Sequence, residues 1–505
     1  MHSFGQCTVA SSTLRGVEAC PVDVEVVVSR GMPGFAIVGM PDAAIQEAKE
    51  RIRAAIQACG FTMPGDKVVV NLAPSSIRKG GTGFDLPIAV GLLTATGQIP
   101  LDIARRFLIV GELSLEGGVK GVPGLLSHAL CAKACGFDFL CGVPSEGFVP
   151  VEGLDARMVR FLGMLRMGDF ETPEAYLPKE EFRAPDFRDI AGHDTAKRVM
   201  QIAAAGNHGV LMMGPPGSGK TMLASCLPSI LPPLTEEEQL ESAMIYSVVG
   251  ESADALLQGV RPFRKPHHSA TLPGLIGGGS PLRPGEVSLA HNGVLFLDEI
   301  AEFKPSVLQA LRQPMEAGEV NITRADGNVR FPSRFTLIAA SNPCPCGYAG
   351  DAQHECTCSP GKIEAYRHRI GGPLLDRIDM RIDVARLPSG DVMASGEGTD
   401  SAKLRDGVMR AREFKEWRVL RQDTGVQGQC PGSVRNRLGR LLEECKLDDA
   451  SVEFFQEVAD RSHLSGRAIA KTLAVSRTIA DLDESEPVTL DALAEALQYR
   501  VGERV

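Results

Sequence analysis

The sequence predicts an α/β protein of about three domains. The first observation is its length of 505 residues, because a domain commonly takes roughly 150. The second is the alternation of short β-branched runs with helical patterns as far as residue 386, and the third is a mostly helical pattern from residue 402 onward. Hydrophobic residues make up 44% and charged residues 23% of the chain, which is typical of a globular protein.

The composition also restricts the class of protein. The formal net charge of −10 argues against a protein that coats nucleic acid over its whole surface, but it leaves room for a local basic track. No apolar run approaches the ~18 residues of a membrane helix, and the first nine residues do not resemble a secretory signal. The 13 cysteines are an odd number, spread over a long chain in which no export signal is recognised. A disulfide scaffold is therefore not expected, and reduced thiols in a cytoplasm are the better interpretation.

Shifts in composition divide the chain into five segments. Residues 1–177 are expected to form one α/β domain, and residues 178–188 a linker. Residues 189–386 contain short, apolar, turn-flanked runs that fit buried parallel strands separated by helices. Residues 387–401 are rich in Gly, Ser, Pro and Asp and are expected to form a hinge loop before a helical lid over residues 402–505.

A phosphate-binding loop is predicted between an expected strand, residues 210–213, and an expected helix, residues 222–227. Its glycines let several backbone N–H groups face one phosphate, and the helix N-terminus adds partial positive charge. Lys220 is expected to reach the β- and γ-phosphates, and the Thr221 hydroxyl is expected to hold Mg²⁺. The alternative is a Gly/Pro-rich turn with a chance lysine. The pattern G-x-x-x-x-G-K-[ST] is complete in Gly214, Pro215, Pro216, Gly217, Ser218, Gly219, Lys220 and Thr221.

Two acids follow the apolar run at residues 294–297. They are expected at the carboxyl end of the sheet, where α/β proteins bind ligands. Asp298 is the expected Mg²⁺ partner, and Glu299 is placed to polarise a water that attacks the γ-phosphate. The alternative is a pair of solvated acids that end a strand.

The chain carries further short sequence motifs. They lie at residues 31–35, 71–74, 84–87, 261–268 (RPFRKPHH), 277–279, 284–291, 341–347 (SNPCPCG), 372–379 (GPLLDRID) and 496–500. With these stretches the chain resembles AAA+ ATPases, and more closely the magnesium-chelatase-like branch known as the ComM/YifB family. The resemblance implies an N-terminal domain of the Lon-protease-like (ribosomal S5 domain 2-like) type. It also implies a central AAA+ ATPase core and a helical lid of the magnesium-chelatase C-terminal type.

The same resemblance implies roles for single residues. Asn342 resembles the sensor that helps to place the attacking water, and Arg377 resembles the arginine finger that acts on ATP held by the neighbouring subunit. Arg467 resembles the lid arginine that senses the γ-phosphate. Ile190 and Gly192 are expected to border the adenine.

Arg377 has a plainer alternative, as an intrachain partner of Asp376 or Asp379, and Arg369 is a nearby second candidate for the finger. An arginine that acts on a neighbour requires a ring, and the resemblance implies a homohexamer with ATP sites between subunits.

Two insertions are expected to line the pore of such a ring, at residues 273–284 and 321–331. The second is expected to be a hairpin with Asp326-Gly327 at its turn. Arg324 and Arg330 flank that turn and are candidates for contact with a DNA backbone. The alternative is an exposed, charged hairpin without a ligand.

Two cysteine pairs lie in the loop at residues 344–358. Four thiolates can bind one tetrahedral Zn²⁺ and brace a loop, so Cys344, Cys346, Cys356 and Cys358 are candidate ligands of a structural zinc ion. The C-x-C spacing is less common than C-x₂-C, and simple loop cysteines are the alternative. His354 is a spare candidate ligand.

The N-terminal segment lacks the residues of a Lon-type peptidase. The nucleophile region has Gly83-Phe84-Asp85 without serine, and Leu126 lies where the lysine base is expected. A scaffold or DNA-contacting domain is therefore preferred. Arg78 and Lys79 are interpreted as a solvated basic loop, with nucleic-acid contact as the alternative.

Together these observations predict an ATP- and Mg²⁺-dependent hexameric motor. The resemblance implies a DNA helicase that drives branch migration in homologous recombination during natural transformation, with single-stranded or branched DNA as its partner. The alternatives are a magnesium-chelatase motor subunit and an AAA+ regulator that remodels proteins.

Overall fold

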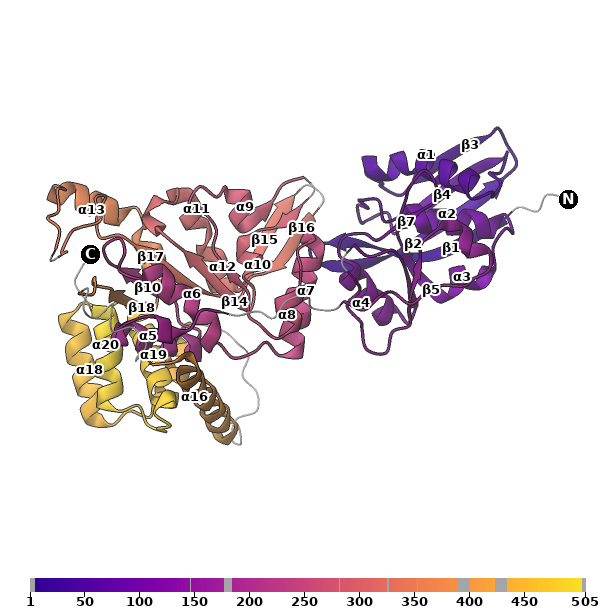
Figure 1. Cartoon of the computed structure of the whole chain (residues 1–505). Coiled ribbons are helices and arrows are strands. Elements are labelled where there is room, and N and C mark those ends of the chain that lie inside the picture. Colours follow the sequence, from indigo (N-terminus) through magenta and orange to yellow (C-terminus); the bar gives the residue numbers. More distant parts are fainter. Residues whose placement is uncertain are drawn as a thin grey trace.

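The computed structural model describes residues 5–501 except 146, 177–183, 281, 325–326, 352, 389–398 and 423–433. An N-terminal block lies beside a larger block that contains a central sheet and, at its lower edge in the view, a group of C-terminal helices (Figure 1). Within the described residues, no helix is both long enough and apolar enough to cross a membrane.

The N-terminal block is built on one seven-stranded sheet with the order β3-β4-β2-β1-β5-β8-β9. Alternate residues of β2 are buried, from Val22 to Val28, because successive side chains of a strand point to opposite faces. The strands are β1 (Gly5–Arg15), β2 (Glu18–Ser29), β3 (Gly34–Val38), β4 (Lys67–Ala73), β5 (Phe107–Val110), β8 (Asp138–Gly142) and β9 (Ala156–Val159). The helices are α1 (Ala43–Ala58), α2 (Asp85–Ala95), α3 (Leu101–Arg106) and α4 (Leu125–Cys135).

The basic pair after β4 differs from the sequence expectation. Lys79 is fully buried, so the prediction of a solvated basic loop is wrong for this residue. Its ammonium donates hydrogen bonds to the carbonyl oxygens of Gly39 and Pro74, which provide the partners that a buried cation needs.

The position expected for a peptidase nucleophile is filled by structural contacts. Phe84 is buried, and the buried Asp85 receives two hydrogen bonds from Arg51, at 2.7 and 2.9 Å. Leu126 is also buried. These side chains pack the segment where a nucleophile and its base would face solvent.

The central sheet has the order β11-β14-β17-β10-β18, and its neighbouring strands pair in parallel. Residues of β14 are buried throughout, as expected for a strand covered on both faces. The strands are β10 (Val210–Met213), β11 (Phe263–Arg264), β14 (Gly293–Leu297), β17 (Phe335–Ser341) and β18 (Met380–Asp383). The main helices around it are α5 (Asp194–Gly206), α6 (Lys220–Ile230) and α7 (Glu236–Val249), with the shorter α11 (Pro305–Ala310), α12 (Arg312–Ala317), α13 (Pro360–His368) and α14 (Gly372–Leu375).

Two insertions extend from this sheet toward the N-terminal block (Figure 1). The first contains α9 (Leu272–Ile276) and the short pair β12 (Gly277–Gly278) and β13 (Arg283–Pro284). The second is the expected hairpin, formed by β15 (Glu319–Arg324) and β16 (Gly327–Pro332). Its turn residues 325–326, including Asp326, lie outside the described residues.

The hairpin and α7 attach the N-terminal block to the larger one. Arg15 donates a hydrogen bond to the carbonyl oxygen of Asn328 at 3.2 Å, and Gly124 N–H donates to the carbonyl oxygen of Ser247 at 2.9 Å. Val17 and Leu126 belong to the same buried apolar cluster as residues of α7 and the central sheet. The two blocks therefore share part of their core.

The C-terminal helices pack against α5 and α6. Phe187, which falls in the expected linker, is buried in their shared core, and its N–H donates to the Ser401 hydroxyl at 2.9 Å. The most buried ion pair of these helices joins Arg418 to Asp481 at 3.2 Å. The helices are α16 (Ser401–Gln422), α17 (Val434–Cys445), α18 (Asp449–Arg461), α19 (Gly466–Leu482) and α20 (Leu490–Val501).

Candidate nucleotide site

The predicted phosphate loop joins β10 to α6 and borders a cavity of about 430 Å³. Gly217 and Gly219 have positive φ angles of 76° and 87°, which L-residues with side chains rarely adopt. Lys220 is folded back on the loop, where its ammonium donates to the carbonyl oxygens of Gly214 and Pro215 at 2.7 and 2.8 Å. Burial lowers the pKa of Lys220, while the charges of Asp298 and Glu299 act in the opposite direction.

The two acids line the same cavity. The Thr221 hydroxyl donates to Asp298 Oδ2 at 2.9 Å, and the Glu299 N–H donates to Asp298 Oδ1 at 3.1 Å. Asn342 lies directly after β17 and also lines the cavity. The structure therefore brings together Lys220, Thr221, Asp298, Glu299 and Asn342.

The donor set around Asp298 fits a divalent cation. A hydroxyl oxygen and a carboxylate oxygen, 2.9 Å apart, are the oxygen ligands that Mg²⁺ takes beside phosphate groups. The same oxygen, Asp298 Oδ2, accepts a hydrogen bond from the Lys265 ammonium at 2.9 Å, so a positive group already lies at this point.

Lys265 and His268 lie next to the two acids, and neither was predicted from the sequence to be part of the site. His268 Nδ1 lies 3.8 Å from Glu299 Oε2. The stretch RPFRKPHH was noticed only for its resemblance. Phe263–Arg264 forms a short strand that pairs in parallel with β14, so the residues after it lie next to the end of β14. A strand predicted at Phe263–Arg264 would have placed Lys265 and His268 near the acids.

Arg377 and Arg467 meet at one carboxylate outside the lining of this cavity. Arg377 Nη2 lies 2.5 Å and Arg467 Nη2 3.1 Å from Glu316 Oε1. Arg377 thus has an intrachain partner, as the plainer alternative expected, but this partner is Glu316 and not Asp376 or Asp379, and Asp379 pairs with Lys471 at 2.6 Å. The side chain of Arg377 is only 8% exposed.

The remaining candidates lie apart from that pair. Arg369 pairs with Glu302 at 3.4 Å. Ile190 is buried and Gly192 has a φ of 52°, and the next residue, His193, lies close to Gly219 of the phosphate loop. The segment expected to border adenine therefore begins beside the loop.

The four candidate zinc ligands form one cluster. The sulfur atoms of Cys344, Cys346, Cys356 and Cys358 all lie within 4.8 Å of one another, so these four thiols could hold a metal ion. His354 faces elsewhere, stacking on Tyr348 with ring centroids 4.8 Å apart and contacting Arg386 at 3.2 Å.

This cysteine cluster packs directly against the phosphate loop. A Cβ added to Gly347 would lie 2.7 Å from Cδ of Pro216. Arg386, which contacts His354, donates to the carbonyl oxygen of Pro216 at 2.8 Å. The shape of the cysteine loop therefore affects the position of the phosphate loop.

The two candidate DNA-contacting arginines are on opposite strands of the hairpin. Arg330 is exposed on β16 and pairs in register with Asn321. Arg324 ends β15, and its side chain lies outside the described residues.

The parallel sheet, the phosphate loop and the C-terminal helices are consistent with a magnesium-chelatase-like AAA+ protein. Residues 186–392 match the family described as magnesium chelatase, subunit ChlI. Residues 24–146 match subunit ChlI of Mg-chelatase, and residues 398–500 match the C-terminal region of that subunit.

Comparison with curated proteins gives the family. The chain is 40% identical to Competence protein ComM of Haemophilus influenzae, over 98% of both chains. It is 38% identical to YifB of Escherichia coli, over 97% of this chain and 96% of that protein. A magnesium-chelatase 38 kDa subunit of Cereibacter sphaeroides is 25% identical, over 60% of this chain and 95% of that subunit. The chain belongs to the ComM/YifB family of magnesium-chelatase-like proteins, and this family suggests an ATPase that uses ATP and Mg²⁺.

The contact between Gly347 and Pro216 generates a prediction about nucleotide affinity. We expect Gly347→Ala to raise the dissociation constant for ATP about tenfold, because a displaced Pro216 moves the backbone groups that would face phosphate. Gly350→Ala is the matched control, since Gly350 also has a positive φ, 81°, but nothing lies within 4 Å of an added Cβ. Titration with a fluorescent ATP analogue measures both. Equal affinities in the two variants would contradict the prediction.

Proposed function

We propose that this chain is the subunit of a ring-shaped ATPase that moves DNA during recombination. The observation that carries the ATPase is the convergence of Lys220, Thr221, Asp298, Glu299 and Asn342 on one cavity. Each of these side chains supplies a group that phosphoryl transfer to water requires.

The roles follow from the chemistry of each side chain. Lys220 exchanges the carbonyl oxygens of Gly214 and Pro215 for phosphate oxygens, and the loop N–H groups bind the same phosphates. Glu299 accepts the proton of the attacking water, and Asn342 orients that water. Mg²⁺ held by Thr221 and Asp298 would neutralise charge between the β- and γ-phosphates.

The arginine cluster supports an assembly in which subunits share their sites. Arg377 and Arg467 converge on one oxygen of Glu316 as two cations would on a phosphate oxygen, and neither lines the cavity of its own subunit. We infer that Arg377 acts on ATP bound by a neighbouring copy and that Arg467 is the lid arginine that senses the γ-phosphate. This arrangement requires a closed ring, for which a homohexamer is proposed.

DNA is the proposed partner because one of the relatives that match along nearly the whole chain is named for competence. We propose a helicase that drives branch migration in homologous recombination during natural transformation. The hairpin arginines Arg324 and Arg330 are the proposed contacts with the DNA backbone. A chelatase motor is the weaker alternative, since the chelatase subunit aligns with only 60% of this chain.

The N-terminal block is proposed to be a Lon-protease-like scaffold that lacks peptidase activity. The buried Phe84 and Leu126, together with the pair of Arg51 and Asp85, support this interpretation. The proposed division of the chain is an N-terminal domain (1–177), an ATPase core (189–386) and a helical lid (402–505).

A structural zinc ion is proposed at the cysteine cluster. Four sulfur atoms within 4.8 Å of one another need little movement to surround a tetrahedral ion. The ion would brace the loop that packs against Pro216.

The proposed DNA motor predicts that DNA stimulates ATP hydrolysis. We expect the purified protein to hydrolyse ATP faster in the presence of forked or single-stranded DNA. Glu299→Gln should lower the rate about 100-fold or more while ATP still binds, because the variant loses only the proton acceptor. Glu237→Gln, which changes an exposed acid of α7, is the control and should retain activity. Hydrolysis that no DNA alters would leave an ATPase and reject the DNA motor.

The shared site predicts complementation between inactive subunits. Lys220→Ala and Arg377→Ala should each be nearly inactive alone. Mixed in equal amounts, they should recover about a quarter of the wild-type activity, because some interfaces combine an intact loop with an intact arginine. A mixture of Lys220→Ala with Glu299→Gln is the control and should recover none. Recovery in both mixtures, or in neither, would count against a trans arginine.

The cysteine cluster predicts bound metal. We expect about one zinc ion per chain by elemental mass spectrometry of protein purified under reducing conditions without chelator. Replacing Cys356 and Cys358 together by serine should remove the zinc, whereas serine at the exposed Cys135 should not. Wild-type protein with no zinc would refute this site.

A further inference from the structure

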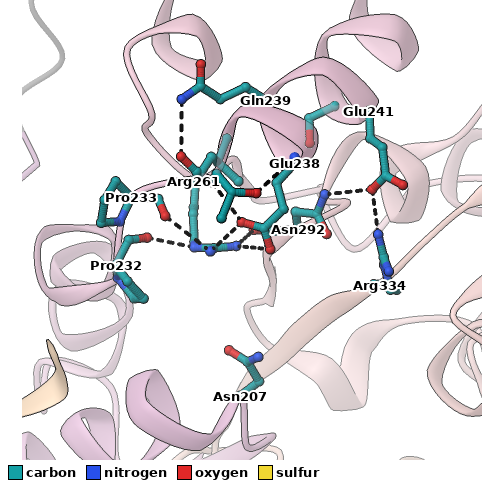
Figure 2. Close-up of polar contacts among 12 residues, drawn as sticks. Asn207, Pro232, Pro233, Glu238, Gln239, Glu241, Arg261, Asn292 and Arg334 are labelled. Atoms are coloured by element: carbon teal, nitrogen blue, oxygen red, sulfur yellow. Dashed lines mark hydrogen bonds and ion pairs between the residues drawn. The ribbon is translucent and has the colours of Figure 1, made fainter. Parts of the chain in front are cut away.

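The segment that carries Lys265 is held by ion pairs and hydrogen bonds before β11 and within it. Before the strand, the Arg261 guanidinium donates to the carbonyl oxygen of Pro232 and to Glu238, each at 2.7 Å (Figure 2). Within the strand, Arg264 pairs with Glu286 at 2.7 Å and with Glu251 at 2.8 Å. These ion pairs fix the backbone from which Lys265 emerges.

Strand register then directs Lys265 to the acids. Phe263 pairs with Val294, and Arg264 with Leu295, so the next residue of this strand lies beside Phe296. The Lys265 ammonium is 5.2 Å from the centre of the Phe296 ring and 2.9 Å from Asp298 Oδ2. The aliphatic part of Lys265 thus spans the last residues of β14 and brings its charge to the end of the strand.

The oxygen that Lys265 contacts is the one that also accepts from Thr221. Asp298 Oδ2 receives both hydrogen bonds at 2.9 Å. A cation bound between the Thr221 hydroxyl and this carboxylate would lie within a few ångströms of the ammonium. At that separation two positive charges repel strongly in a partly buried site, so the cation and Lys265 cannot both occupy the carboxylate at low cost.

We propose that Lys265 is a positioning residue that competes with Mg²⁺ for Asp298. The inference rests on the proposed function, since it concerns the metal that accompanies ATP. The Lys265 ammonium neutralises Asp298 until the nucleotide and its metal arrive, and then swings outward. Its side chain is 42% exposed, so solvent is available to receive the displaced charge.

Competition makes a specific statement about Mg²⁺. Breaking the pair between Lys265 and Asp298 costs free energy. This cost raises the concentration of Mg²⁺ that is needed for tight ATP binding. Because partly exposed ion pairs are weak, we expect their removal to lower the half-saturating Mg²⁺ by a modest factor, about threefold to fivefold. Affinity for ATP at saturating Mg²⁺ should not change, because the pair is then already broken.

The test measures binding instead of turnover. N-methylanthraniloyl-ATP is titrated into Glu299→Gln protein, which cannot hydrolyse it, at a series of Mg²⁺ concentrations. Lys265→Met retains the aliphatic stem over Phe296 and removes the charge, and Lys265→Arg restores the charge. Lys304→Met is the matched control, because Lys304 is an exposed lysine directly before α11. Thermal melting of each variant checks that its fold is intact.

We expect Lys265→Met alone to lower the half-saturating Mg²⁺, with Lys265→Arg and Lys304→Met like the parent. An unchanged midpoint in Lys265→Met overturns the proposal. A loss of affinity at saturating Mg²⁺ also overturns it, because Lys265 would then be a phosphate ligand. If the Glu299→Gln parent binds no nucleotide at any Mg²⁺ concentration, the proposed function fails first and the competition fails with it.

Discussion

The parallel pairing of β14 with β17, and of β17 with β10, is the constraint on which the candidate site depends. Leu297 is in register with Ala339, and Met213 with Ser341, so three strands end at one edge of the sheet. The groups that follow these ends are distant in the chain, because 77 residues separate Thr221 from Asp298 and 44 separate Asp298 from Asn342. A shift of one residue in any of these pairs would turn every side chain of the strand to the opposite face.

Four positively charged candidate residues, in the cavity or near it, pair with groups of their own chain. Lys220 binds loop carbonyl oxygens, Lys265 binds Asp298, and Arg377 and Arg467 bind Glu316. In the proposed function, nucleotide binding would therefore exchange partners instead of creating contacts from unpaired charges. Such exchange avoids the large cost of buried, unpaired cations and leaves only small differences in free energy between the two sets of partners.

The sequence allowed the local features to be predicted, because they depend on residues close together in the chain. The strand over residues 210–213, the phosphate loop and the hairpin that includes residues 321–331 follow from turn chemistry and periodicity, and the cysteine pairs were visible as spacing. Features that depend on distant contacts were missed. Glu316 binds Arg377 across 61 positions, and Lys265 reaches Asp298 across 33.

Lys79 and Phe187 illustrate the same limit for burial. Both lie in stretches whose composition is typical of solvated loops or linkers. Yet the Lys79 ammonium donates to the carbonyl oxygens of Gly39 and Pro74, and Phe187 is buried in a core shared with the C-terminal helices. Gly39 is 40 positions from Lys79, and Ser401 is 214 positions from Phe187, so these partners are not apparent from the neighbouring sequence. Tertiary packing decided their environment, as it often does where local propensity is weak.

The apolar cluster shared by the two blocks has a thermodynamic consequence. Val17 and Leu126 of the N-terminal block lie in one core with Tyr246 of α7, and burying each such side chain contributes roughly 1.5–3 kcal/mol. Separating the two blocks would expose that apolar surface to water. The two blocks therefore stabilise one another, and a loss of packing in one lowers the stability of the other.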